Sequence, residues 1–134
     1  MIVDTSVVFK WFVMEEGRDE ARALIGETLF APELILAELG NAAWLKYRKR
    51  TMVQEQVLAI PALAQSFISL VPMEQLSEAA LHICLEIDHP IYDCYFLALA
   101  QAMDTKLITF DRRLHSQCQQ SAYQSLVDCL GDKP

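Results

Sequence analysis

Glycine and proline are scarce in this sequence, with four and five residues among 134. Hydrophobic residues make up 53% of the chain, and its mean hydropathy is positive. A chain of this composition has enough apolar side chain to offset the entropy lost on folding, which excludes intrinsic disorder. Its length suits one globular domain and leaves too little chain for two, so we expect residues 1–134 to form a single domain.

The sequence also lacks a membrane span and an export signal. Residues 56–73 carry no charged side chain, but Pro61, Pro72 and interior polar residues interrupt the apolar surface that a bilayer core demands. At the N-terminus, Ile2 and Val3 lead directly to Asp4, without the basic region and long apolar run of a signal peptide. We therefore expect a cytoplasmic protein with no membrane association.

No two cysteines have the CxxC spacing of a zinc or redox motif. Most of them lie in apolar stretches, which favours reduced core thiols over a disulfide framework or a zinc site. No histidine stands in a recognisable motif with a nucleophile, so catalysis by Cys or Ser is not indicated. Basic residues are few as well: 11 Lys and Arg against 18 Asp and Glu give a net charge of −7, whereas nucleic-acid binders driven by overall charge are usually basic.

Short apolar runs alternate with helical patterns along the chain. We expect helices over residues 15–27 and 33–47, a helix that starts at Thr51 and bends near Pro61, and a short helix capped by Asp111. A further helix has Ser77 as its N-cap, and a buried one covers residues 92–103. This alternation predicts an α/β/α sandwich with a central, mostly parallel sheet of four or five strands. The expected strands are 2–3, 28–31, 69–71, 106–109 and 126–129.

Four acidic residues interrupt apolar segments: Asp4 in IVDTSVV, Glu38 in LILAELGNAAWL, Asp93 in IYDCYFLALA and Asp111 in LITFDRRL. Asp4 and Asp111 follow expected strands, and the C-terminal ends of parallel strands share one sheet edge, where open α/β folds place their ligand sites. Asp93 begins a buried helix, and Glu38 lies with Asn41 on the expected core-facing side of another. We therefore expect the four carboxylates to converge.

Carboxylates that converge repel one another, by about 4 kcal/mol for a pair about 4 Å apart at an effective dielectric of about 20. A hard divalent cation, Mg²⁺ or Mn²⁺, resolves this conflict, because it takes carboxylate oxygens, keeps several waters and leaves positions for phosphate oxygens. Such an ion lowers the pKa of a bound water and neutralises charge on a leaving oxygen. Phosphodiester hydrolysis is the reaction that fits these residues.

Each acid taken alone has a simpler interpretation, as a turn residue, a helix cap or one half of an ion pair. The functional interpretation gains from polar neighbours that can orient carboxylates. These neighbours are Thr5, Ser6, Asn41 and Thr109.

Together these segments resemble the PIN-domain ribonucleases, and among them the VapC-like toxins of bacterial type II toxin–antitoxin modules. The resemblance rests on IVDTSVVFKWF, AELGNAAW, HPIYDCYFLALA and LITFDRRL, which follow one another in the family's order and spacing over nearly the whole chain. It implies a metal-dependent endoribonuclease that hydrolyses RNA phosphodiesters with metal-activated water, using Mg²⁺ or Mn²⁺. It also implies homodimers and a cognate antitoxin that occupies the active-site groove.

The resemblance maps the family's acids onto Asp4, Glu38, Asp93 and Asp111. We expect Asp4 and Asp93 to be the principal metal ligands. Glu38 and Asp111 are expected to complete the pocket and to help place the water.

Supporting groups follow from the same resemblance. Thr109 and Ser6 match the family's hydroxyls, and Asn41 matches the amide one turn after its helical acid. Cys94, where the family often has a small residue, and the bulky Phe110 depart from the pattern, and both bear on substrate choice.

RNA contacts are expected from cationic side chains at the pocket rim. The basic run after the Glu38 helix can meet phosphates, or it can be a solvated helix end favoured by the dipole. Two alternatives to a toxin stay open: a PIN-like nuclease that processes RNA or cuts DNA flaps, and a catalytically silent interaction module. The candidate rim residues are Lys10, Lys46, Arg48, Lys49, Arg50, Arg112 and Arg113.

Overall fold

Five short strands form one sheet in the computed structural model, which describes residues 1–131. The strands are β1 Ile2–Val3, β2 Phe30–Pro32, β3 Ser69–Val71, β4 Leu107–Thr109 and β5 Val127–Cys129. All neighbouring strands run parallel, in the order β3-β2-β1-β4-β5. The first strand is therefore central, and its Ile2 and Val3 pair with Leu107 and Ile108 of β4. This arrangement confirms the predicted parallel sheet.

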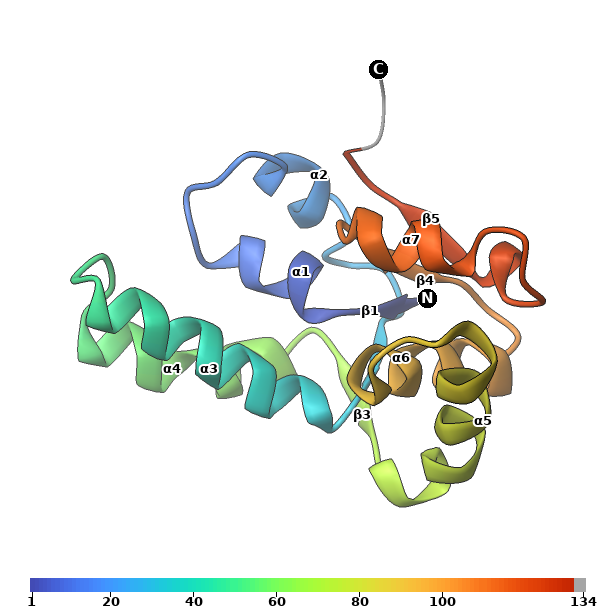
Figure 1. The fold of residues 1–134 in the computed structure, drawn as a ribbon. Coiled ribbons are helices and arrows are strands. Elements are labelled where there is room, and N and C mark those ends of the chain that lie inside the picture. The colour runs from blue at the N-terminus through green and yellow to red at the C-terminus, as the bar shows by residue number, and fades with distance from the viewer. Residues whose placement is uncertain (132–134) are drawn as a thin grey trace.

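Helices connect the strands and cover both faces of the sheet. The α-helices are α1 Thr5–Val8, α2 Arg18–Arg22, α3 Leu34–Arg48, α4 Gln54–Gln65, α5 Ser77–Ile87, α6 Ile91–Ala102 and α7 Arg112–Cys118, and the 3-10 helices are Phe9–Trp11, Met73–Gln75 and Gln124–Leu126. In Figure 1, α5 and α6 lie to the lower right of the central strand β1, α1 and α2 lie to its upper left, and α7 lies against β5. The hairpin of α3 and α4 extends to one side. These layers confirm the predicted α/β/α sandwich.

Helix α6 is buried along most of its length, as its apolar sequence predicts. It contacts β1, β2 and β4, so it covers the middle of one sheet face. Its Phe96 and Leu97 belong to the same core as Ile2 and Leu107 of the central strands. Within residues 1–131, no helix, α6 included, has both the length and the hydrophobicity needed to span a bilayer.

Helix α3 confirms the predicted helix over residues 33–47, but it buries a different face. Glu38 and Asn41 were expected on the core-facing side, whereas Asn41 is exposed and Glu38 is half-buried. Large aliphatic side chains bury more apolar surface than a neighbouring alanine or amide, so they occupy the core side. The buried residues of α3 are Ile35, Leu39 and Ala43.

The helix expected over residues 15–27 is much shorter, since α2 covers only five of these residues. Gly17, with a φ of 87°, holds the left-handed conformation at the N-terminal end of α2. After α2 the chain turns, and Leu24 and Ile25 pack against the core from these turns. The apolar residues of this segment therefore face the core as predicted, but the predicted length of the helix is wrong.

Two helix starts also differ from the prediction. Helix α4 begins three residues after Thr51, where the side chain of Gln56 accepts a hydrogen bond from the backbone N–H of Val53 at 2.9 Å. Ser77 is the first residue of α5 and not its cap. The chain remains helical through Pro61.

Candidate active site

Asp4 lies where β1 ends and α1 begins, and only 6% of its surface is exposed. Its Oδ1 accepts hydrogen bonds from the Ser6 hydroxyl at 2.6 Å and from the backbone N–H of Val7 at 3.3 Å. Its Oδ2 accepts one from the Thr109 hydroxyl at 2.5 Å. The bond from Val7 makes Asp4 the N-cap of α1, so the local backbone holds the carboxylate at the end of the central strand.

Thr109, the last residue of β4, links Asp4 to Asp111. Its hydroxyl donates to Asp4 and accepts a hydrogen bond from the backbone N–H of Asp111 at 2.9 Å. The Ser6 hydroxyl lies 3.2 Å from that of Thr109 and accepts from the backbone N–H of Phe110 at 2.8 Å. These bonds tie the C-terminal ends of β1 and β4 together, with Ser6 and Thr109 in the supporting positions that the sequence predicts.

Glu38 reaches the same region from α3. The hydroxyl of Thr5 donates a hydrogen bond to Glu38 Oε1 at 2.7 Å. Thr5 follows Asp4 directly in the chain, so one short segment orients both acids. Asn41, by contrast, is exposed, and no hydrogen bond joins its side chain to these acids in the part of the chain that the structure describes.

Asp93 projects from the first turn of α6, with 30% of its side chain exposed. Its Oδ2 lies 2.7 Å from Nε2 of His89, a residue that is only 7% exposed. We did not anticipate this contact from the sequence. The available signal was a histidine four residues before the acid, next to the proline at the N-cap of α6.

Asp111 caps α7, as predicted. Its Oδ1 accepts hydrogen bonds from the backbone N–H groups of Arg113 at 2.9 Å and Leu114 at 3.1 Å. The bond that ties Asp111 to Thr109 comes from its backbone N–H and not from its carboxylate. Asp111 is therefore linked to Asp4 through its backbone and the Thr109 hydroxyl, while its carboxylate caps α7.

The charge of Asp93 contributes to the raised pKa of two other acids, Asp4 and Glu38. Burial raises the pKa of Asp4 from its ordinary value of 3.8 to about 7; hydrogen bonds from two hydroxyls oppose this rise, and the charge of Asp93 adds to it. Burial also raises the pKa of Glu38, the hydrogen bond from Thr5 opposes that rise, and the charge of Asp93 again adds to it. The charge of Asp93 thus acts on both other acids.

Apart from the contact of His89 with Asp93, these three acids have no basic partner in the described chain: among residues 1–131, no Lys or Arg forms an ion pair with any of them. Nor does this range contain three His, Cys, Asp or Glu side chains placed as a ready-made metal cluster. Mg²⁺ needs no such cluster, because it is usually held by one or two carboxylates and keeps several waters. The oxygen donors of Asp4 and Asp93, with negative charge that no Lys or Arg balances, fit such an ion.

Cys94 and Phe110, the two departures noted in the sequence, have different surroundings. Cys94 is buried, its Sγ donates to the carbonyl oxygen of Pro90 at 3.4 Å, and burial raises the pKa of its thiol to about 12. It therefore belongs to the core. Phe110 lines a cavity of about 400 Å³ together with Lys10 and Arg112, and the Lys10 ammonium lies 4.9 Å from the centre of its ring.

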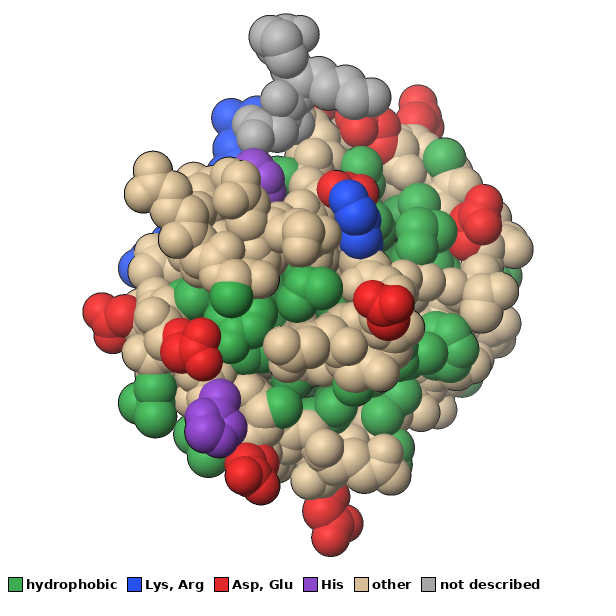
Figure 2. All heavy atoms as spheres, turned by 90° about the vertical axis from the view of Figure 1, so that its right-hand side faces the viewer, with side chains coloured by type: hydrophobic (Ala, Val, Ile, Leu, Met, Phe, Trp, Pro, Cys, Tyr) green, Lys and Arg blue, Asp and Glu red, His purple; other side chains and the backbone are tan. Residues whose placement is uncertain are grey.

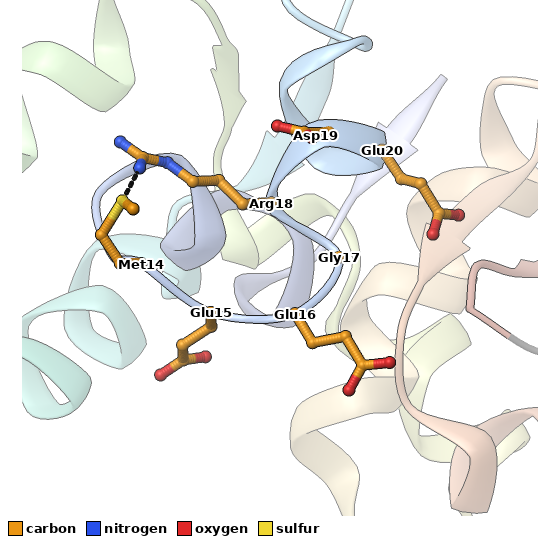
Figure 3. A pocket seen from close by; sticks show the side chains of 7 residues that line it. All are labelled: Met14, Glu15, Glu16, Gly17, Arg18, Asp19 and Glu20. Carbon is orange, nitrogen blue, oxygen red and sulfur yellow. Dashed lines mark hydrogen bonds between the residues drawn. The ribbon is translucent and has the colours of Figure 1, made fainter.

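A second cavity, of about 570 Å³, is lined by residues 14–20 (Figure 3). The acidic side chains of this loop point in different directions and do not meet at one point (Figure 3). Glu15 is engaged by Lys46 at 2.9 Å and by Lys10 at 3.7 Å. This cavity is therefore no second carboxylate site, and its ion pairs fasten the loop to α3.

Cationic residues expected at the rim also have partners within the chain. Lys46 forms an ion pair with Glu15. The guanidinium of Arg48, in the same helix, lies 5.1 Å from the centre of the Trp44 ring. Figure 2 shows the face that lies on the right of Figure 1, where α5 is found. Acidic side chains are spread over this face, and its described residues form no broad basic patch (Figure 2). Lys10 and Arg112 are the rim candidates that line the cavity beside Phe110, which Glu16 and Glu20 also line.

A model of the PIN domain family matches residues 1–118, a range that contains all four acids. The chain belongs to the PIN domain family. This PIN-domain chain is 24% identical over 119 residues to Ribonuclease VapC3 of Pyrobaculum aerophilum, and the match covers 85% of this chain and 91% of the relative. The family predicted from the sequence is thereby confirmed.

Solved structures with this PIN-domain fold include a toxin–antitoxin complex from Klebsiella pneumoniae, with a TM-score of 0.68 and 16% identity, which covers 95% of this chain and 94% of that one. Another is VapC20 of Mycobacterium tuberculosis, described as a sarcin–ricin loop cleaving toxin. It has a TM-score of 0.66 and 16% identity, and the match covers 86% of this chain and 92% of that one. These structures confirm the predicted PIN-like fold.

Proposed function

We propose that this PIN-domain protein is a Mg²⁺- or Mn²⁺-dependent endoribonuclease and the toxin of a type II toxin–antitoxin module. The observation that carries the proposal is the buried carboxylate of Asp4, which shares its electrostatic environment with Glu38 and Asp93 without a Lys or Arg partner in residues 1–131. Membership of the PIN domain family and the similarity to Ribonuclease VapC3 support ribonuclease activity.

Each of the four acids has a separate part in the proposed reaction. Asp4 and Asp93 would hold the divalent ion, which would supply positive charge at the phosphate and acidify a water. Glu38, held by Thr5, accepts a hydrogen bond from the attacking water and so orients it. Asp111 completes the pocket from the N-terminus of α7.

RNA is the proposed substrate, since one relative is named a ribonuclease and a structural neighbour is described as cleaving the sarcin–ricin loop. Lys10 and Arg112, which line the cavity beside Phe110, are proposed to contact its phosphates. The protein is proposed to act in the cytoplasm as a single domain.

Two protein partners are proposed. The Klebsiella toxin–antitoxin complex supports a cognate antitoxin that covers the active-site groove. A homodimer is supported by exposed hydrophobic side chains on the α3–α4 hairpin, because apolar surface of this kind marks interaction sites. These side chains are Trp44, Leu45, Tyr47, Leu58 and Leu63.

The test is cleavage of end-labelled structured RNA by the purified protein with Mg²⁺, Mn²⁺ or EDTA. Asp93→Asn removes one proposed ligand, and Asp88→Asn makes the same chemical change at a nearby exposed position. We expect discrete products with either metal from the wild type and from Asp88→Asn, and intact RNA from Asp93→Asn and in EDTA. Equal cleavage by Asp93→Asn would contradict the proposed site.

The toxin role needs a separate measurement. Expression of the wild type, but not of Asp93→Asn, is expected to arrest growth, and the product of a small neighbouring gene is expected to relieve the arrest. RNA cleavage without growth arrest would favour a processing nuclease. Identical behaviour of wild type and Asp93→Asn in both assays would favour a catalytically silent interaction module.

A further inference from the structure

His89 makes a side-chain contact with one of the proposed metal ligands, and its role goes beyond the four acids. Nε2 of His89 lies 2.7 Å from Oδ2 of Asp93. A carboxylate accepts hydrogen bonds and donates none, so Nε2 carries the hydrogen in this contact. We propose that His89 is a positioning residue that holds the Asp93 carboxylate in the orientation required to bind a divalent ion, a role that rests on the proposed metal-dependent function.

The backbone around His89 fixes the place of its ring. Helix α5 ends at Ile87, its C-cap Asp88 has a left-handed φ of 52°, and the backbone N–H of His89 donates to the carbonyl oxygen of Cys84 at 3.3 Å. Pro90 follows as the N-cap of α6, and Cys94 Sγ donates to the carbonyl oxygen of His89 at 3.7 Å. Because His89 lies between the C-cap of α5 and the N-cap of α6, its backbone is held in place, and its ring stays close to Asp93.

Burial separates this role from direct catalysis. With 7% of its surface exposed, His89 has little access to a substrate phosphate, whereas 30% of the Asp93 side chain is exposed. The imidazole engages Oδ2 of the Asp93 carboxylate. An imidazole that orients a ligand in this way acts through that ligand, as outer partners in metal sites do.

Asp93 needs such a partner because its neighbours repel it. Burial raises the pKa of Asp4 and of Glu38, and the negative charge of Asp93 adds to both shifts, as repulsion between like charges does. Asp4 is held by hydroxyls and a backbone N–H, and Glu38 is held by the hydroxyl of Thr5. His89 does the same for Asp93 and keeps its carboxylate beside the other two.

The experiment measures Mn²⁺ affinity by titration, with free Mn²⁺ followed by electron paramagnetic resonance, in the full chain without RNA. His89→Gln places an amide N–H close to the position of Nε2 and is expected to bind within about threefold of the wild type. His89→Leu fills a similar volume without a donor and is expected to weaken binding by about 10- to 100-fold, the range found for outer partners of metal ligands. Asp93→Asn provides the reference for a lost ligand.

Thermal unfolding in EDTA shows whether each variant folds. If His89→Leu does not fold, His89→Asn replaces it, because its shorter side chain puts the amide near Nδ1 and leaves Asp93 without the donor. Weakened binding by the folded donor-free variant, together with retained binding by His89→Gln, supports the assignment. Wild-type affinity in the donor-free variant, or equal weakening in His89→Gln, would overturn it.

The outcomes separate this inference from the proposed function. If the Mn²⁺ affinities follow the expected order and RNA stays intact, the positioning role holds and the ribonuclease proposal fails. If RNA is cleaved and all His89 variants bind Mn²⁺ like the wild type, only the positioning role fails. A wild type that binds no Mn²⁺ would overturn both.

Discussion

The hydroxyl of Thr109 donates a hydrogen bond to Oδ2 of Asp4 at 2.5 Å, although the two residues are 105 positions apart in the sequence. Both are buried, and Asp4 is the one buried residue among the four acids. The bond joins the ends of β1 and β4, which pair directly in the sheet. The place of the central carboxylate therefore depends on a hydroxyl from a distant strand.

Thr109→Val tests this dependence, because valine keeps the shape of the side chain and removes the hydroxyl. Asp4 and the backbone N–H of Asp111 each lose a hydrogen-bond partner. We expect a loss of about 1–3 kcal/mol in the free energy of unfolding, measured with urea in EDTA. Thr28→Val makes the same change at an exposed position and is expected to stay within about 0.5 kcal/mol of the wild type. Equal stability of the two variants would contradict the argument.

Much of this site could be predicted from the sequence, because its position follows from topology. The central strands are short apolar runs that end in polar residues, and the ends of parallel strands share an edge. Recognition of β1 and β4 as parallel strands therefore predicted that Asp4 and Asp111 share one sheet edge, whereas the direct pairing of the two strands, which brings Thr109 to Asp4, comes from the structure. The capping role of Asp111 was equally predictable, since it depends only on the residues that follow it.

Other features depend on packing that a periodic pattern does not describe. Helix α3 has apolar residues on more than one face, so the sequence pattern does not determine which face is buried. In the structure, Ile35 and Leu39 contact the core, and the face that contains Asn41 does not. His89 lies outside any helix, so no helical pattern relates it to Asp93. Their contact arises from the turn at Asp88, which only the folded backbone reveals.

The raised pKa of Asp4 predicts that the stability of the metal-free protein depends on pH. Its pKa is about 7 in the folded state and 3.8 ordinarily, so the folded chain holds a proton that the unfolded chain has lost. This contribution to stability is complete below the lower pKa and disappears as the pH rises through the higher one. We expect the melting temperature in EDTA to fall by roughly 5 °C between about pH 5 and about pH 8.

Asp4→Asn provides the comparison, because its side chain does not titrate. Its melting temperature is expected to change less over the same range, and the difference between the two proteins isolates the contribution of Asp4. Addition of Mn²⁺ at about pH 8 is expected to stabilise the wild type more than Asp4→Asn, since an ion that binds only the folded state raises its stability. Parallel pH profiles of the two proteins would contradict the prediction.

Asp111 has two roles that substitutions can separate. Asparagine is as good an N-cap as aspartate, so Asp111→Asn is expected to unfold within a few tenths of a kcal/mol of the wild type, whereas Asp111→Ala is expected to lose about 1 kcal/mol. Both variants lose the negative charge proposed for the pocket. We expect both to cleave RNA at least about tenfold more slowly. Wild-type cleavage by Asp111→Asn would mean that this residue serves only as a cap.

Alanine substitutions at Gly17 and Gly26 distinguish the effect of backbone strain from that of a steric clash with Phe110. Both have left-handed φ values, 87° and 106°, so alanine is strained at either position. A Cβ on Gly17 would lie 2.7 Å from Cε1 of Phe110, whereas nothing lies within 4 Å of one on Gly26. We expect Gly26→Ala to lose about 1 kcal/mol of stability to urea. Gly17→Ala is expected to lose about 1–3 kcal/mol more, because Phe110 must move.

The displacement of Phe110 in Gly17→Ala is also expected to change the position of the Asp4 carboxylate. Its backbone N–H donates to Ser6, and the next residue, Asp111, donates to Thr109, so a shift of this segment disturbs both hydroxyls that hold Asp4. Gly17→Ala should therefore bind Mn²⁺ more weakly than Gly26→Ala under conditions in which both are folded. Equal Mn²⁺ affinities would show that the Phe110 ring moves without its backbone and that the loop before α2 acts on stability alone.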